Sequence, residues 1–219
     1  MFEAVIFDWD GTLANTRGVI VDSFQKALLE LHCKVSDEFI ERRIGIGSEE
    51  TFKEILQEAK IEFDSVLISR LVENKIHAEI AMSNKVNLFE GVEDLLKSLC
   101  GKVKLALASM NNREVIDYLV REKKIRRFFN IVLTVDDIQF PKPNPEIFLK
   151  AATQLGVRAE TCVVVEDSIF GVRAARSARM GCVAVLTGVY SKAELLMANP
   201  NLVVDSLNEK AKILDFILR

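Results

Sequence analysis

The stretch that decides the fold lies near the start of the chain and reads Ala4-Val5-Ile6-Phe7-Asp8-Trp9-Asp10-Gly11-Thr12. Its continuous apolar run is typical of a strand that is buried on both faces of a parallel sheet. Two carboxylates, Asp8 and Asp10, follow that run at once. Ligands of open parallel sheets bind beyond the carboxyl ends of the strands. This strand end is therefore the first place to expect a functional site.

Strand-length apolar runs alternate with helix-length segments from residue 100 onward. The runs occupy residues 104–108, 131–134, 162–165, 182–186 and 202–204. Between them, apolar residues recur with helical spacing, as at Val115, Leu119 and Val120. Such alternation predicts a parallel sheet with helices on both faces. We therefore expect an α/β fold whose core is a Rossmann-like, doubly wound parallel sheet.

Residues 16–82 differ from the rest of the chain because no strand-like run interrupts them. Their apolar residues recur with helical spacing. The first such stripe consists of Ile20, Phe24, Ala27, Leu28 and Leu31. Ser36 and Ser48 precede acidic pairs and are predicted to cap the starts of two helices. We expect an all-helical cap over residues 16–82, inserted into a catalytic core of residues 1–15 and 83–219.

The composition narrows the class of protein. The chain has 219 residues, 49% of them hydrophobic, which is enough for one sizeable core and a small second lobe. A net charge of −3 gives no strong field for nucleic acid or an anionic membrane, so neither is expected as a partner. No apolar run approaches the ~18 residues of a membrane span. Glu3 and Asp8 stand where a signal peptide would be basic and then apolar. We expect a cytoplasmic monomer.

Three predicted strand ends carry oxygen-bearing side chains that would meet at one edge of the sheet. These side chains belong to Asp8, Asp10, Ser109, Glu166 and Asp167. Clustered carboxylates repel one another unless a cation neutralises them. A hard divalent ion meets this need, and Mg²⁺ favours a few carboxylates together with substrate phosphate and water. The sequence therefore predicts a Mg²⁺ site.

Lys142 offers a positive charge to the same site from Pro141-Lys142-Pro143-Asn144-Pro145, a loop that its prolines stiffen. A metal ion, a lysine and a hydroxyl at a helix start are together what a phosphoryl group needs. A neighbouring carboxylate can attack that group and form an aspartyl-phosphate. Taken singly, these residues have ordinary explanations: a turn, a helix cap, a solvated lysine and an acidic helix start. Their occurrence in order at three strand ends favours the functional explanation.

These residues resemble the motifs of the haloacid dehalogenase superfamily. Asp8-Trp9-Asp10-Gly11-Thr12-Leu13 is similar to the first motif, DxDGT, and Ser109 to the second. Lys142 in Lys-Pro-Asn-Pro-Glu-Ile-Phe resembles the third, and Val165-Glu166-Asp167-Ser168 the fourth. The resemblance spans the whole chain. It is strongest to the β-phosphoglucomutase-like and phosphoglycolate-phosphatase-like branch, in which an inserted helical segment forms a cap.

The resemblance implies roles for the four carboxylates. Asp8 is implied as nucleophile and metal ligand, and Asp10 as general acid and base whose backbone carbonyl also binds the metal. Asp167 is implied as a further ligand, with Glu166 beside it as a ligand or as a residue that supports the ligands. An aspartate at position 10 separates this chain from the dehalogenases, which attack carbon. It favours phosphate-ester chemistry, because an alkoxide leaving group needs a proton.

The resemblance also implies phosphate contacts and an overall activity. Ser109 and Lys142 are implied to hold the transferring phosphoryl group, and Asn111 to contact it. We therefore expect a Mg²⁺-dependent phosphatase that hydrolyses the phosphate monoester of a small metabolite through an aspartyl-phosphate intermediate. The alternatives are a β-phosphoglucomutase-like sugar-phosphate mutase and a non-catalytic binding module on the same fold. The intact set of motif residues argues against the binding module.

Three positions depart from the family pattern. Mutases of this branch carry a cap histidine where this chain has Ile20, and a cap arginine where it has Ser48. Both departures favour a phosphatase over a mutase. The family usually has glycine where Arg179 stands. That substitution indicates an altered helix end rather than altered chemistry.

Overall fold

Six parallel strands form the central sheet of the computed structural model, which describes all 219 residues. Their spatial order is β5-β4-β1-β6-β7-β8. The strands are β1 (Ala4–Phe7), β4 (Lys104–Ala108), β5 (Ile131–Leu133), β6 (Cys162–Glu166), β7 (Gly181–Val185) and β8 (Leu202–Val204). The chain builds outward from β1 in one direction and then from β6 in the other. The expected doubly wound parallel sheet is confirmed, and its switch in direction lies beside β1.

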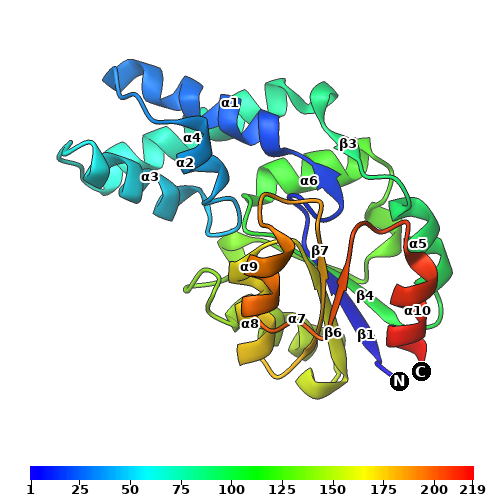
Figure 1. Cartoon of the computed structure of the whole chain (residues 1–219). Helices are drawn as coiled ribbons and strands as arrows, with labels where there is room; N and C mark the ends of the chain where they lie inside the picture. Colours follow the sequence, from blue (N-terminus) through cyan, green and yellow to red (C-terminus); the bar gives the residue numbers. More distant parts are fainter.

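Helices cover both faces of this sheet, as Figure 1 shows. One face packs against α5 (Val92–Leu99), α6 (Arg113–Glu122) and α10 (Lys210–Leu218). The other face packs against α7 (Glu146–Leu155), α8 (Ile169–Ser177) and α9 (Lys192–Met197). Successive strand residues alternate between two separate cores, because side chains in a strand point to opposite faces. This double burial explains why the strands read as unbroken apolar runs.

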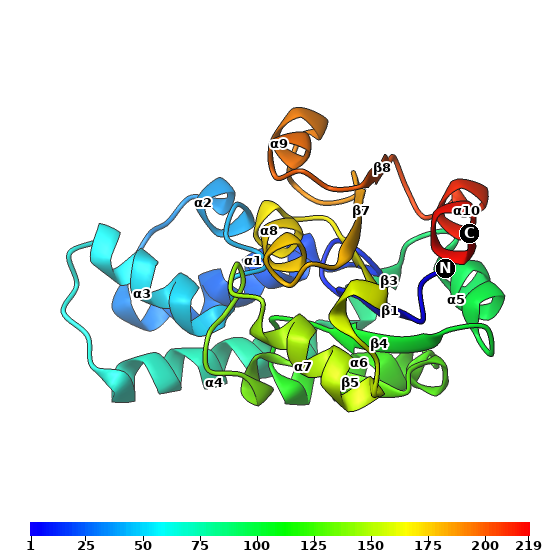
Figure 2. The same cartoon turned by 90° about the horizontal axis from the view of Figure 1, so that it is seen from below.

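The strand register brings the three functional strand ends to one level. Phe7 lies beside Leu107 of β4 and Val165 of β6. The next residues along these strands are Asp8, Ala108 and Glu166, so polar groups emerge together at the carboxyl edge. Both termini lie at the opposite edge, close to each other (Figure 2), where the Phe2 N–H donates to Ile217 O at 3.1 Å.

Four helices between β1 and β4 lie over the carboxyl edge of the sheet (Figures 1 and 2). They are α1 (Arg17–Leu28), α2 (Asp37–Glu41), α3 (Ser48–Glu58) and α4 (Ser65–Ala81). Eleven buried residues form a third apolar core among them. The two connections to the rest of the chain pair as a small antiparallel sheet, β2 (Ala14–Asn15) with β3 (Asn87–Leu88). We propose that residues 16–82 form a cap, because they enclose a core of their own.

Short 3-10 helices complete the secondary structure. They are η1 (Leu29–Leu31), η2 (Ser83–Lys85), η3 (Arg126–Phe128), η4 (Val135–Asp137) and η5 (Ala159–Thr161). None of the helices has both the length and the apolarity that crossing a bilayer requires.

One of the two predicted helix caps is correct and one is wrong. The Ser36 hydroxyl accepts a hydrogen bond from the Phe39 N–H at 3.2 Å and caps α2. The N-cap of α3 is Gly47, and Ser48 is the first helical residue. The Ser48 hydroxyl instead donates to Asn112 Oδ1 in the core, at 3.3 Å. Contact with the core replaces the local cap, which the sequence pattern of α3 does not encode.

Candidate functional site

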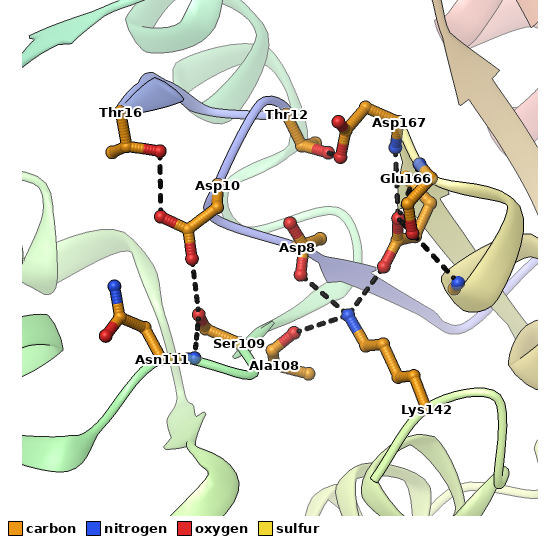
Figure 3. A network of polar contacts seen from close by, with 12 residues as sticks. Asp8, Asp10, Thr12, Thr16, Ala108, Ser109, Asn111, Lys142, Glu166 and Asp167 are labelled. Atoms are coloured by element: carbon orange, nitrogen blue, oxygen red, sulfur yellow. Dashed lines mark hydrogen bonds and ion pairs between the residues drawn. The ribbon is translucent and has the colours of Figure 1, made fainter. Parts of the chain in front are cut away.

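The seven residues predicted from the sequence lie together at the carboxyl edge of the sheet, and all are buried (Figure 3). They are Asp8, Asp10, Ser109, Asn111, Lys142, Glu166 and Asp167. The tight loop after β1 positions the first two, with Gly11 at φ +78°. A side chain at Gly11 would lie 2.2 Å from Asp167 Oδ2, so both the conformation and the close approach require glycine.

Lys142 joins the ends of β1 and β6. Its ammonium donates to Asp8 Oδ1 at 2.6 Å and to Glu166 Oε1 at 2.5 Å. It also lies 3.4 Å from the carbonyl oxygen of Ala108, at the end of β4. The lysine side chain is completely buried. One cation from the loop before α7 therefore links all three functional strand ends.

Glu166 has no free oxygen. Its Oε1 accepts from Lys142, and its Oε2 accepts from the Asp167 N–H, the Ser168 N–H and the Ser168 hydroxyl at 3.0–3.1 Å. A side chain at Gly171, in the first turn of α8, would collide with this carboxylate. Glu166 is thus fixed by its surroundings and in turn orients Lys142.

Asp8 and Asp167 each keep one oxygen that receives no hydrogen bond from the protein. Asp8 uses Oδ1 for Lys142, and Asp167 uses Oδ1 to accept from the Thr12 hydroxyl at 3.1 Å. Oxygens of Asp8, Glu166 and Asp167 lie within 4.8 Å of one another. An acidic cluster of this kind suits a divalent cation with oxygen ligands. The free oxygens of Asp8 and Asp167 suit such an ion better than the carboxylate of Glu166, whose two oxygens already accept hydrogen bonds.

Asp10 points away from this cluster, toward the cap. Thr16 donates to its Oδ1 at 2.8 Å, and the Ser109 hydroxyl lies 3.4 Å from its Oδ2. The Asn111 N–H in turn donates to the Ser109 hydroxyl at 3.0 Å. The two aspartates that are one residue apart in sequence therefore have separate surroundings. Asp8 faces the lysine and Asp10 faces hydroxyl groups.

Burial and mutual repulsion shift the ionisation of the acidic cluster. Burial raises the pKa of Asp8 well above its ordinary value, and the Lys142 ammonium opposes part of that rise. Burial raises the pKa of Asp167, and the negative charge of Glu166 adds to the rise. Burial alone would lower the pKa of Lys142, but the carboxylates of Asp8 and Glu166 outweigh it and raise that pKa. One lysine does not offset this many buried carboxylates, so a further cation would stabilise their ionised forms.

The ionisation of Asp10 is coupled to the cap. Burial raises the pKa of Asp10 to about 6, and the negative charge of Glu79 contributes to the rise. Lys75 and the hydrogen bond from Thr16 act in the opposite direction. A carboxyl with this pKa can give and take protons near neutral pH.

Sequence analysis did not assign Lys75 and Glu79, one turn apart on α4. The structure buries both, and they form an ion pair. Asn111 lies between cap and core: its Oδ1 accepts from Lys75 at 2.9 Å, and its Nδ2 donates to Glu79 Oε1 at 2.7 Å. The sequence signal for the pair was only an i,i+4 lysine and glutamate, which usually lies on an exposed helix face. Thr12 and Thr16, which support Asp167 and Asp10, were likewise not assigned.

A small open cavity, with about 30 Å³ accessible to the centre of a water-sized sphere, lies between cap and core beside Asp10. Its walls include Ile20 and Phe24 of α1, Lys75 of α4 and Asn111 of the core. The cavity borders Asp10 rather than the acidic cluster of Asp8, Glu166 and Asp167.

The haloacid dehalogenase-like hydrolase family model matches residues 5–185, most of the chain. The chain belongs to this hydrolase family. Among curated relatives of this haloacid dehalogenase-like hydrolase, the probable phosphatase IndB of Dickeya dadantii is 31% identical, over 94% of this chain and 90% of the relative. The pyrophosphatase PpaX of Bacillus cereus is 28% identical, over 96% of this chain and 95% of its own length.

Solved structures give the same result for the haloacid dehalogenase-like hydrolase. A hydrolase from Pseudomonas syringae has a TM-score of 0.90 and 27% identity, covering 98% of this chain and 99% of that structure. A β-phosphoglucomutase from Clostridium difficile has a TM-score of 0.86 and 28% identity, and the match covers both chains fully. The chain is thus a phosphatase-type hydrolase by family, on a fold that mutases also use.

Proposed function

We propose that this hydrolase is a Mg²⁺-dependent phosphatase that acts on the phosphate monoester of a small metabolite through an aspartyl-phosphate on Asp8. The observation that carries the proposal is the contrast between the two neighbouring aspartates. Asp8 lies against the Lys142 ammonium at 2.6 Å. Asp10 lies among hydroxyl groups beside the cavity. One is suited to attack phosphorus, and the other to transfer protons.

The reaction has two steps. A carboxylate oxygen of Asp8 attacks phosphorus, the phosphorus–ester oxygen bond breaks, and Asp10 donates a proton to the departing alcohol. Asp10, now ionised, takes a proton from a water molecule that attacks the aspartyl-phosphate. Inorganic phosphate leaves and the Asp8 carboxylate is regenerated. Lys142 and Ser109 hold the phosphoryl oxygens in both steps, where donors aimed at developing charge have their largest effect.

The free oxygens of Asp8 and Asp167, with the backbone carbonyl of Asp10, are proposed to hold Mg²⁺. When bound, the ion supplies positive charge next to the phosphoryl oxygens. We assign Glu166 the role of orienting Lys142, because both of its oxygens are already engaged. Asn111 is proposed to support Ser109, because its backbone N–H donates to the Ser109 hydroxyl, rather than to contact the phosphate itself.

The cap cavity supports a phosphatase over a mutase. No histidine lines the cavity, and Ile20 presents an apolar surface there. A mutase of this branch would need a general acid in the cap. The side chain at this position of α1 offers no such group.

The test is phosphate release from an aryl phosphate and a panel of phosphorylated metabolites, with and without Mg²⁺. We expect Mg²⁺-dependent release, and a loss of at least about 10³-fold in the Asp8→Asn variant, because the nucleophile is removed. Asp22→Asn, an exposed aspartate in the cap, is the matched control. Turnover by Asp8→Asn close to that of the wild type would refute the role of Asp8. A mutase would instead convert a sugar phosphate to its isomer without releasing phosphate, and a binding module would do neither.

A further inference from the structure

The space available to a leaving group is small. The cavity beside Asp10 offers only about 30 Å³ to the centre of a water-sized sphere. This is far below the roughly 300 to 1,000 Å³ of ordinary ligand pockets. The space therefore favours a small leaving group over one of the size of a nucleoside.

Two cations reach the wall of this cavity, and each is already paired within the cap. Arg43 Nε lies 2.6 Å from Glu54 Oε2, and Arg43 Nη1 donates to the Phe39 carbonyl at 3.0 Å. Lys75 is paired with Glu79. Each cation that lines the leaving-group space is therefore neutralised by one carboxylate of the cap.

The Lys75–Glu79 pair is the more restrictive of the two, because it is inaccessible to solvent. Lys75 is 2% exposed and Glu79 is fully buried. Apart from that ammonium, Glu79 Oε2 has no partner, and Glu79 Oε1 accepts from Asn111. Separating a buried pair leaves an uncompensated charge in a poorly solvated space. Lys75 is therefore not available to a second anion in the cavity.

An anionic leaving group would find no unpaired cation in the cavity. A carboxylate or a second phosphate would lose hydration there without gaining an ion pair, because Lys75 and Arg43 are already paired, and burying an uncompensated charge is costly. An uncharged hydroxyl group meets no such penalty. Ser48 and Thr51 line the same space, and their hydroxyl oxygens can accept hydrogen bonds from an alcohol.

We propose that the substrate is the phosphate monoester of a small uncharged polyol, and that Glu79 is the positioning residue that excludes anionic leaving groups by neutralising Lys75. This inference rests on the proposed phosphatase function. Such an enzyme would differ from a pyrophosphatase, whose leaving group is a phosphate, and from a phosphoglycolate phosphatase, whose leaving group carries a carboxylate.

The test compares substrates that share a carbon skeleton and differ in charge. Glycerol 3-phosphate and 3-phosphoglycerate form one pair, and ethylene glycol phosphate and 2-phosphoglycolate form a second. Pyrophosphate and an aryl phosphate complete the set. For each pair, kcat/KM of the neutral substrate is divided by that of the anionic substrate. We expect a ratio of at least about ten for the wild type.

Two variants separate charge from structure. In Glu79→Gln, Lys75 is left unpaired, so we expect the ratio to fall at least tenfold, mainly through a lower KM for the anionic member. In the double variant Lys75→Met/Glu79→Gln the cavity is neutral again, and the preference for the neutral member should return. Glu93→Gln removes the carboxylate of an exposed i,i+4 pair with Lys97, far from the cavity, and should leave the ratio unchanged.

The outcomes distinguish failure of the inference on the leaving group from failure of the proposed phosphatase function. Wild-type preference for the anionic members, or hydrolysis of the aryl phosphate but of no neutral member, overturns the inference and leaves the phosphatase function intact. A folded Glu79→Gln protein with an unchanged ratio also overturns it. Absence of Mg²⁺-dependent, Asp8-dependent phosphate release from every compound, the aryl phosphate included, instead overturns the proposed function.

Discussion

Two buried lysines lie on opposite sides of the proposed reaction centre, one in the core and one in the cap. Lys142 contacts two carboxylates at the ends of different strands, and Lys75 pairs with one carboxylate on its own helix. Both are at most 2% exposed. Only Lys142 was recognisable as a functional residue in the sequence, because it stands in a proline-rich motif. Lys75 has the spacing of an ordinary surface pair.

Charge balance thus divides the site into two parts. On the core side, several carboxylates surround one lysine, so the region is short of positive charge and suits a metal ion and a phosphoryl group. On the cap side, each cation has its own carboxylate, so the region is neutral. A phosphate ester of an uncharged alcohol matches both parts at once.

The largest effect is expected when the same substitution is made at the two lysines. Lys142→Met should lower kcat for an aryl phosphate by at least about 10²-fold, the usual effect of removing one donor to the transition-state charge. Lys75→Met should lower kcat by less than about tenfold, since it contacts the leaving-group space. Steady-state kinetics of both variants gives the comparison. Equal losses in kcat would contradict the division of the site.

The stability of the same variants provides a second comparison of the two lysines. Removing one partner of a buried ion pair costs about 3–5 kcal/mol. Both substitutions should therefore lower the free energy of unfolding, measured by urea denaturation, and Lys142→Met more so because two carboxylates lose their partner. Lys97→Met removes the cation of the exposed pair with Glu93 and should cost under about 1 kcal/mol.

A smaller effect is expected at the outer contact between cap and core. Arg42, at the end of α2, lies 2.5 Å from Glu194 of α9, and its guanidinium stacks 4.2 Å from the Tyr190 ring centroid. The Tyr190 hydroxyl also donates to the Arg42 carbonyl at 2.6 Å. We expect Arg42→Ala to raise KM about two- to fivefold, because an exposed pair contributes little. Added salt should reduce the difference from wild type, because it screens exposed charges.

The control for this contact is Arg70→Ala, whose partner Glu30 lies in the cap as well. That variant removes an exposed arginine pair without touching the junction between cap and core. Its KM should stay at the wild-type value. An equal rise in KM in both variants would show that cap stability, rather than contact with the core, sets the effect.

The smallest effect is expected at the end of α8, remote from both lysines. Arg179 follows the helix with φ +59°, a left-handed conformation that costs a side-chain-bearing residue about 1–2 kcal/mol. Arg179→Gly should raise the free energy of unfolding by about 0.5–1 kcal/mol with kcat unchanged. Arg173→Gly, an exposed position within the same helix, should lower it by about 1 kcal/mol. A stability loss in Arg179→Gly would show that the arginine makes a compensating contact.

Local sequence patterns predicted the parts of the site that strand ends carry. The register of β1 between its neighbours places Asp8 level with Glu166, so a strand-end pattern is enough to bring them together. Asp10 was placed in the same cluster, but its side chain turns toward Thr16 and the cap. The turn after β1 decides this direction, and alternating hydrophobicity does not specify it.

The cap residues were beyond prediction for a physical reason. Ser48 has the sequence context of an N-cap, yet its hydroxyl reaches Asn112 because the core lies against the start of α3. Lys75 and Glu79 are buried only because α4 covers Asn111. Helical periodicity identifies the face that packs within the cap. It carries no information on what a second domain covers afterwards.

The sequence by itself determined the six strands, the inserted helical segment and the strand-end carboxylates, because burial on both faces and motif spacing are local properties of the chain. Only tertiary contacts fixed which carboxylate oxygens stay free and that Lys75 and Glu79 are buried as a pair. Those features depend on contacts between residues that are 32 to 155 positions apart. Packing within the core, and of the cap on the core, fixes such contacts, and no pattern along the chain records them.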